Sequence, residues 1–196
     1  MTQPPISRFP VPDLDSLPSD VQQIFHQVSE KAGFVPNVLW VLAHRPDELR
    51  AFWAYHEALM RRKSNLTKGE REMIVVATSA ANQCLYCVVA HGAILRVYEK
   101  SSTIAETIAT NYHKADISDR QKAMLDFALK TCNFSHSIDE NDFSTLRVHG
   151  FDDEDIWDIG AIAAFFALSN RMASLTSMRP NDEFYALGRD LPAGAS

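Results

Sequence analysis

The amino-acid sequence predicts an all-α fold, and three observations lead to this prediction. Apolar residues recur at helical spacing over most of the 196-residue chain, the alternation typical of strands is scarce, and the seven glycines are spread thinly. Hydrophobic residues make up 46% of the chain and charged residues 22%, which is enough for a real core. We therefore expect one helical domain at 19–180, with an arm at 1–18 and a tail at 181–196 that is irregular or briefly helical.

The first elements follow from prolines and from helical spacing. The arm contains four prolines before Pro18 and no continuous apolar run, which indicates an extended segment lying on the surface, not a signal peptide. Phe34–Trp40 is typical of a turn leading into a helix, which ends before Pro46 because the residue preceding a proline disfavours helix. From Asp47, apolar residues recur at intervals of three and four as far as Met60.

Helix-capping signals define the middle of the chain. Thr67 and Glu70 form a capping box, which predicts that a helix begins there and continues through the apolar run that ends at Ala81. Asn82 interrupts this run, and we expect it to cap the start of a second helix from Gln83 to about residue 100.

The same signals predict four further helices. Their ranges are 102–112, 119–131, 140–148 and 153–174, the last of them opening with an acidic first turn that suits the helix dipole. A helix, a loop and an apolar helix with acidic residues in its first turn occur at 47–81 and again at 119–170. A weak internal duplication is therefore one interpretation of the pattern.

Charge and composition exclude several classes of partner. The net charge of −6 gives the whole chain no attraction to nucleic acid or anionic lipid, and the basic residues within 61–71 are typical of a solvated helix–loop junction. The longest uncharged stretch, Ile159–Asn170, is too short to span a bilayer. Three cysteines are too few for a disulfide scaffold and indicate redox or metal chemistry, so we expect a cytoplasmic protein.

Two of these cysteines form a CxxC motif with a histidine beside it. Cys84 and Cys87 are three residues apart, so on a helix they share a face with Cα atoms about 5–6 Å apart, within reach of a disulfide. His91 lies four residues beyond Cys87 and falls on the same face. A helix N-terminus and an imidazole both favour the thiolate form, which predicts a reactive dithiol.

Other candidate groups around the motif have simpler interpretations. Zinc needs four ligands, and the sequence clusters only two cysteines and one histidine, although the pattern leaves a zinc site open. Cys132 lies in an apolar helical segment and is expected to be a core cysteine. His56 and His113 are expected on helix surfaces or half-buried, and Glu72 by spacing alone is a first-turn glutamate.

The stretch Glu70-Arg-Glu72-Met-Ile-Val-Val, followed by Asn82-Gln-Cys84-Leu-Tyr-Cys87-Val-Val-Ala-His91-Gly, resembles the carboxymuconolactone decarboxylase superfamily, in its alkylhydroperoxidase D-like, peroxidase-related branch. The core motif covers about residues 66–96. The family pattern places a glutamate twelve residues before the first cysteine and a histidine four after the second, and Glu72 and His91 fit. Alkylhydroperoxidase D has a histidine immediately before the second cysteine, where this chain has Tyr86. Tyr86 and Asn82 are therefore candidates for the relay or the pocket.

The resemblance implies a homo-oligomeric hydroperoxide reductase that works without haem, metal or flavin. In that scheme Glu72, through His91, helps deprotonate a cysteine, which attacks the peroxide, and the partner thiol then closes a Cys84–Cys87 disulfide. We expect Cys87 to attack because His91 lies one turn beyond it, although the helix-terminus argument alone favours Cys84. The expected reductant is a dithiol or a lipoyl-type protein.

Three alternatives stay open at this point. The first is a general thiol–disulfide oxidoreductase or redox sensor, which needs only an accessible dithiol. The second is a lactone decarboxylase, for which a dithiol has no use, and the third is a non-enzymatic metal-binding or scaffold protein. Five aromatic residues on the predicted helices add to the expectation of a homo-oligomer, since they exceed what a small helical monomer needs to bury: Phe52, Trp53, Trp157, Phe165 and Phe166.

Overall fold

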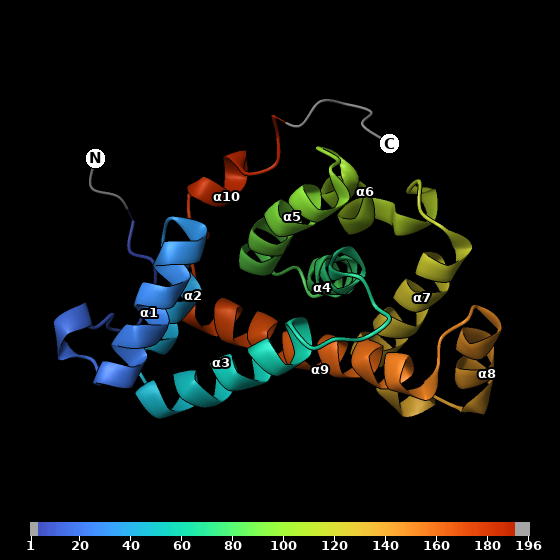
Figure 1. Ribbon diagram of the computed structural model, residues 1–196, viewed down its shortest axis with the longest axis horizontal. Helices are drawn as coiled ribbons and strands as arrows, with labels where there is room; N and C mark the ends of the chain where they lie inside the picture. Colours follow the sequence, from blue (N-terminus) through green and yellow to red (C-terminus); the bar gives the residue numbers. More distant parts are fainter. Residues whose placement is uncertain (1–3, 191–196) are drawn as a thin grey trace.

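The computed structural model describes residues 4–190, which form ten α-helices and no strand, confirming the all-α prediction (Figure 1). The helices are α1 (Ser19–Ala32), α2 (Asn37–Leu42), α3 (Pro46–Met60), α4 (Lys68–Ala81), α5 (Leu85–Glu99), α6 (Ile104–Asn111), α7 (Asp119–Phe134), α8 (Glu140–Val148), α9 (Asp153–Thr176) and α10 (Glu183–Ala186). Short 3-10 turns occur at Leu14–Ser16, Tyr112–Lys114 and Ser135–Ser137.

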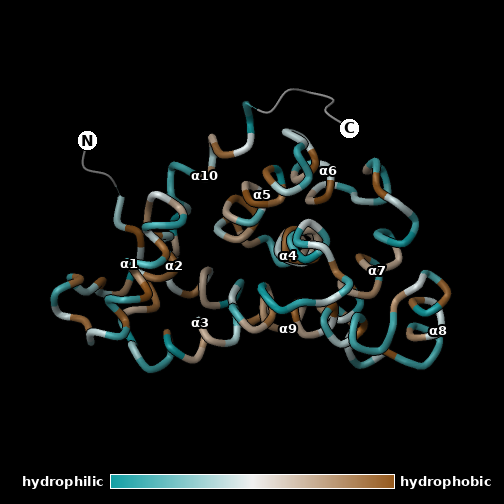
Figure 2. Tube along the Cα trace, viewed as in Figure 1, coloured by the Kyte–Doolittle hydropathy of each residue, from teal (hydrophilic) through white to brown (hydrophobic). Residues whose placement is uncertain are grey.

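Helix α4 is the centre of the fold. It packs against α5, α6, α7 and α9, and Figure 1 shows it end-on with these helices around it. Every residue from Gly69 to Ser79 is buried, as expected for a helix that is surrounded on all sides. Figure 2 shows hydrophobic residues along α5, the helix that follows α4 in the chain.

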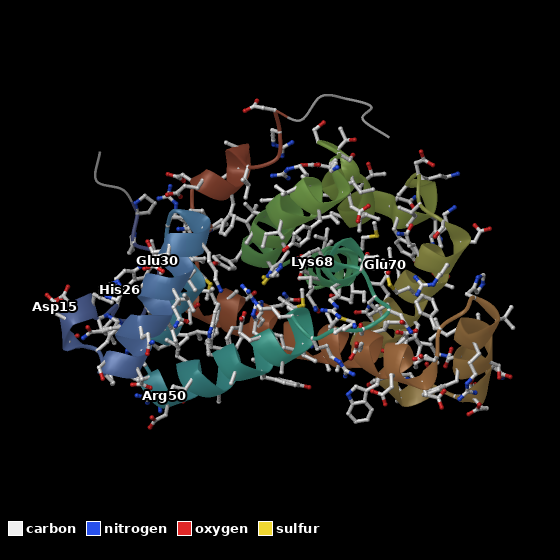
Figure 3. All side chains as sticks on the ribbon, viewed as in Figure 1. Asp15, His26, Glu30, Arg50, Lys68 and Glu70 are labelled. Atoms are coloured by element: carbon white, nitrogen blue, oxygen red, sulfur yellow. The ribbon has the colours of Figure 1, made fainter. Side chains whose placement is uncertain are left out.

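Capping boxes fix where α4, α7, α8 and α9 begin. The predicted pair at the start of α4 is present, with Glu70 N–H donating to Thr67 Oγ1 at 3.0 Å and Thr67 N–H donating to Glu70 Oε2 at 2.9 Å. Figure 3 shows Lys68 and Glu70 at this end of α4, where Glu70 is buried and paired with Arg120 of α7. Helices α7, α8 and α9 also open with capping boxes and start where the sequence predicts.

The connection between α4 and α5 differs from the prediction. Asn82 is the C-cap of α4 and does not start the next helix, which begins at Leu85 with Cys84 as its N-cap. The chain reverses here through Gln83, whose φ of 53° lies in the left-handed region, and Cys84 N–H donates to the Ser79 carbonyl at 2.9 Å. This turn leaves Cys84 just outside the helix, while Cys87 lies within its first turn.

The described part of the arm lies against the end of α9, and the segment after α10 lies against α5. In the described part of the arm, residues 4–18, Arg8 N–H donates to the Thr176 carbonyl at 2.8 Å, and Arg179 N–H donates to the Ile6 carbonyl at 3.1 Å. After α10, the buried Arg96 side chain of α5 donates to the Leu187 carbonyl at 3.0 Å, which holds the tail against the domain. Residues 1–3 of the predicted arm and 191–196 of the predicted tail lie outside the described residues.

Helices α1, α2 and α3 form a side cluster beside this core. Val21, Phe25, Leu39 and Leu49 are fully or almost fully buried within it. On its outer surface, Arg50 pairs with Asp20 and so links α3 to α1; Figure 3 shows Arg50 on the outer side of α3. Within this cluster, α2 contacts α5 beside the dithiol, and α3 packs against α9.

Candidate redox site

Three helices form the candidate site, which lies at the N-terminal end of α5. Helix α4 supplies Glu72, the start of α5 supplies Cys84, Cys87 and His91, and α9 packs across both helices. All three cysteines of the chain are free thiols in the structure.

Glu72 and His91 form a buried pair. Glu72 Oε2 lies 2.7 Å from His91 Nδ1, and the two side chains are only 7% and 13% exposed. The Phe166 ring meets the imidazole edge-on, with the ring centroids 4.7 Å apart. With Nδ1–H donating to the carboxylate, the ring orientation is fixed and Nε2 is left for exchange with a thiol or a substrate. Besides any favourable interaction with the helix dipole, Glu72 therefore fixes the position of the His91 ring through this hydrogen bond.

The two thiols of the motif have different acidities. The Cys87 thiol, acting as a hydrogen-bond donor, lowers the pKa of Cys84 to about 7, against the opposing effect of burial; Asn170 and the charge of His91 add to the lowering. The pKa of Cys87 is raised because its proton is held by Cys84 and because its side chain is buried. The N-cap position of Cys84 also favours a thiolate there. Of the two thiols, Cys84 therefore has the lower pKa.

Polar side chains of α9 complete the surroundings of the dithiol, and sequence reasoning did not identify them. Asn170 is almost fully buried, donates to Ser79 Oγ at 2.9 Å, and lowers the pKa of both thiols. Ser169 Oγ lies 3.8 Å from Cys87 Sγ. The signal in the sequence was a polar pair, Ser169-Asn170, that interrupts an otherwise apolar helix facing the core.

Asn82 extends this network toward the third cysteine. Its amide Nδ2 donates to Asn170 Oδ1 at 2.9 Å and contacts Cys132 Sγ at 3.2 Å. Asn82 is therefore a neighbour of the site through Asn170, and not the cap that the sequence suggested. Cys132 is half-buried near the end of α7, so the prediction of a core cysteine was wrong.

The Tyr86 hydroxyl hydrogen-bonds to α2 and not to the thiols. Its hydroxyl accepts a hydrogen bond from Val38 N–H at 3.1 Å, in the first turn of α2. Burial raises the pKa of this phenol above its usual value, so it holds its proton at neutral pH. Tyr86 therefore anchors α2 to α5 and makes no relay contact in the structure.

The remaining sequence candidates lie outside the dithiol network. His56 is partly buried and stacks on Trp53 with ring centroids 5.4 Å apart, whereas His113 is exposed and lies 3.8 Å from Asp126. Within residues 4–190, no three His, Cys, Asp or Glu side chains are grouped so that they could hold a metal ion.

The fold and the site define a class of helical proteins that carry a paired, buried dithiol beside a carboxylate–histidine pair. The model of the carboxymuconolactone decarboxylase family matches residues 46–128, which contain Glu72, both cysteines of the motif and His91. The chain belongs to this family, in its alkylhydroperoxidase D-like branch.

Two solved structures are similar over nearly the whole chain. One is the alkylhydroperoxidase AhpD core of an uncharacterized peroxidase-related protein from Ralstonia eutropha JMP134, with 66% identity, a TM-score of 0.95, and coverage of 97% of this chain and 100% of that chain. The other is an uncharacterized peroxidase-related protein from Silicibacter sp. TM1040, with 44% identity, a TM-score of 0.91, and coverage of 96% and 100%. Both of these proteins are described as peroxidase-related.

More distant structures share the fold alone. The debrominase Bmp8 is 19% identical, with a TM-score of 0.73 and coverage of 95% of this chain and 97% of that chain. A comparison with curated proteins finds no match.

Proposed function

We propose that this protein is a thiol-dependent hydroperoxide reductase. The observation that carries the proposal is the reduced dithiol, in which Cys84 has a pKa of about 7 and lies beside the buried Glu72–His91 pair. A thiol with this pKa is about half ionised at neutral pH, whereas an ordinary thiol, with a pKa near 8.5, is only a few per cent thiolate. The reactive form is therefore present without a metal or an organic cofactor.

The reaction proceeds in two steps that balance without a further oxidant. The Cys84 thiolate attacks the terminal peroxide oxygen, the O–O bond breaks, and Cys84 becomes a sulfenic acid while the alkoxide takes up a proton and leaves as an alcohol. Cys87 then attacks the sulfenic sulfur, water leaves, and a Cys84–Cys87 disulfide forms. The Glu72–His91 pair stabilises the first thiolate and supplies the proton to the leaving oxygen.

This assignment reverses the roles expected from spacing. Cys87 was favoured because His91 lies one turn beyond it in the helix, but the charge of His91 lowers the pKa of Cys84. In this proposal Cys87 is the resolving thiol, because its proton stabilises the Cys84 thiolate and its own pKa is raised.

Burial of both sulfurs favours peroxide over a protein disulfide as the oxidant. The cysteine residues are only 2% and 1% exposed, so a small peroxide reaches them more easily than a folded protein substrate does. The electron donor is then a low-molecular-weight dithiol or a flexible lipoyl arm that can enter the site. Such a cycle requires a reducing compartment, and the cytoplasm provides it.

The test is peroxide consumption by the purified protein with a dithiol donor, followed by peptide mapping. We expect catalytic turnover, and a Cys84–Cys87 disulfide with Cys132 left free after one equivalent of peroxide. Rapid exchange with protein disulfides without peroxide turnover would instead identify a thiol–disulfide oxidoreductase. A disulfide that included Cys132 would overturn the site assignment.

A further inference from the structure

Asn170 of α9 is held by hydrogen bonds at both ends of its side-chain amide. Asn82 Nδ2, at the end of α4, donates to Asn170 Oδ1 at 2.9 Å, and Asn170 Nδ2 donates to Ser79 Oγ at 2.9 Å. Asn170 is 2% exposed and Ser79 is fully buried. Turning the amide would break both hydrogen bonds in a place that water does not reach, so its orientation is fixed.

The same turn of α9 lies against the dithiol. Ser169 Oγ, one residue before Asn170, is 3.8 Å from Cys87 Sγ. The backbone of Ser79 accepts a hydrogen bond from Cys84 N–H at 2.9 Å, while its hydroxyl accepts the one from Asn170. Ser79 therefore joins the amide to the turn that carries the first cysteine, and the two keep a constant relative position.

One N–H group of the Asn170 amide remains for the thiols. A side-chain amide has two N–H groups, and Ser79 accepts from one of them. Among the hydrogen bonds of residues 4–190, none joins the other to an oxygen. Cys87 has the largest effect on the pKa of Cys84, and Asn170 adds to that lowering; Asn170 also opposes the rise in the pKa of Cys87. The amide therefore favours the thiolate form of the dithiol.

We infer that the held amide of Asn170 sets the reduction potential of the Cys84–Cys87 couple by stabilising the reduced protein as a thiolate. A hydrogen bond to a charged sulfur is stronger than one to a neutral sulfur, and the disulfide carries no charge. The stabilisation therefore acts on the reduced side of the couple, which makes the disulfide easier to reduce. The inference rests on the proposed function in one respect, that the dithiol is redox-active.

The consequence concerns the return half of the cycle. A dithiol donor gives two electrons and two protons to the protein disulfide, and its own two sulfurs become a disulfide. At a pH above about 7, Cys84 then releases one of these protons to solvent. Because the amide favours this ionised state, it shifts the equilibrium toward reduced protein, and a donor of moderate reducing strength is sufficient.

The experiment measures the equilibrium of the full chain with mixtures of reduced and oxidised dithiothreitol, from about pH 6 to about pH 9. Acid quenching, alkylation in denaturant and mass spectrometry count the free thiols, and Cys132 adds a constant label. Asn170→Leu is the main variant, because it keeps the approximate size of the side chain and removes the amide. Thiolate absorbance against pH is recorded for the same proteins.

The expected result is a difference between wild type and Asn170→Leu that depends on pH. At about pH 6, Cys84 is mostly protonated in both proteins, so their equilibrium constants should agree within about twofold. As the pH increases through about 7, wild type gains the thiolate and becomes easier to reduce than the variant, whose Cys84 has a higher pKa. The ratio of the constants should level off at about tenfold for each unit of that pKa difference. Ionisation of dithiothreitol is common to both proteins and cancels in the ratio.

Two further variants separate this effect from a loss of packing. Thr176→Val changes another buried polar side chain of α9, whose hydroxyl donates within its own helix, and it should match wild type at every pH. Asn82→Ala removes the hydrogen bond to Asn170 Oδ1 but keeps the amide, so it should give a smaller change with the same pH dependence. Thermal unfolding shows which variants are folded, and Asn82→Ala decides the test if Asn170→Leu is not.

Three results would overturn the inference. A difference of equal size at every pH would mean that Asn170 affects the fold around the disulfide and not the thiolate. Superimposable thiolate titrations of wild type and Asn170→Leu would remove the physical cause, and an Asn82→Ala protein identical to wild type would show that holding the amide has no effect. No peroxide is used, so a lack of peroxide turnover would reject the proposed function and leave this inference standing.

Discussion

The acidity of Cys84 is predicted to depend on the hydrogen that its neighbour donates. In Cys87→Ala the largest cause of the lowered pKa disappears, while the burial that opposes ionisation stays. We therefore expect the pKa of Cys84 to rise from about 7 toward or above the ordinary thiol value near 8.5. At pH 7 the thiolate fraction would fall from about one half to about 3%, roughly a 15-fold loss of the reactive form.

Cys87→Ser is the matched control for this prediction, because its hydroxyl can still donate to the Cys84 sulfur. Ultraviolet absorbance of the thiolate against pH measures ionisation directly and needs no access to the buried sulfur. In wild type the thiolate, and with it the rate of sulfenic acid formation, should rise as the pH increases through about 7 and level off above it. Superimposable titrations of the alanine and serine variants would refute the role of the donated hydrogen bond.

The other predictions concern the carboxylate–histidine pair and Tyr86. Glu72→Gln and His91→Ala should each lower peroxide turnover by about 10²-fold or more. The double variant should lose little more, since the two residues act as one unit, and additive losses in steady-state kinetics would contradict this. Tyr86→Phe should leave turnover nearly unchanged but cost about 1–3 kcal/mol in the free energy of unfolding, because Val38 N–H loses its acceptor. A large loss of activity without loss of stability in denaturant unfolding would return Tyr86 to the relay.

Local signals in the sequence were sufficient for much of the fold. The box of Thr67 and Glu70 correctly located the start of α4, because a capping box is formed within four consecutive residues and needs no distant partner. The spacing of Cys84, Cys87 and His91 likewise follows from helical geometry once that segment is a helix. Glu72 was found through the family resemblance, since spacing alone gave it no more than a place near the start of a helix.

Long-range packing decided what spacing could not. Asn82 has the composition of a helix cap, but the tight turn through Gln83 and the contact with Asn170 place it at the end of α4. Asn170 is 83 residues from Cys87, and no local pattern links the two. The difference in acidity between the thiols therefore arises from the tertiary structure, which sets the donor, the charge and the burial around each sulfur.

The sequence by itself determined that the chain is helical, where α4, α7, α8 and α9 start, and which four residues are expected to carry the chemistry. Only the tertiary structure decided that Cys84 is the acidic thiol, that Tyr86 anchors α2, and that Asn170 of α9 is held beside the dithiol. The physical reason is the range of the interactions: caps and helical spacing act over a few residues, whereas burial and hydrogen bonds between helices depend on segments that meet only in the folded chain.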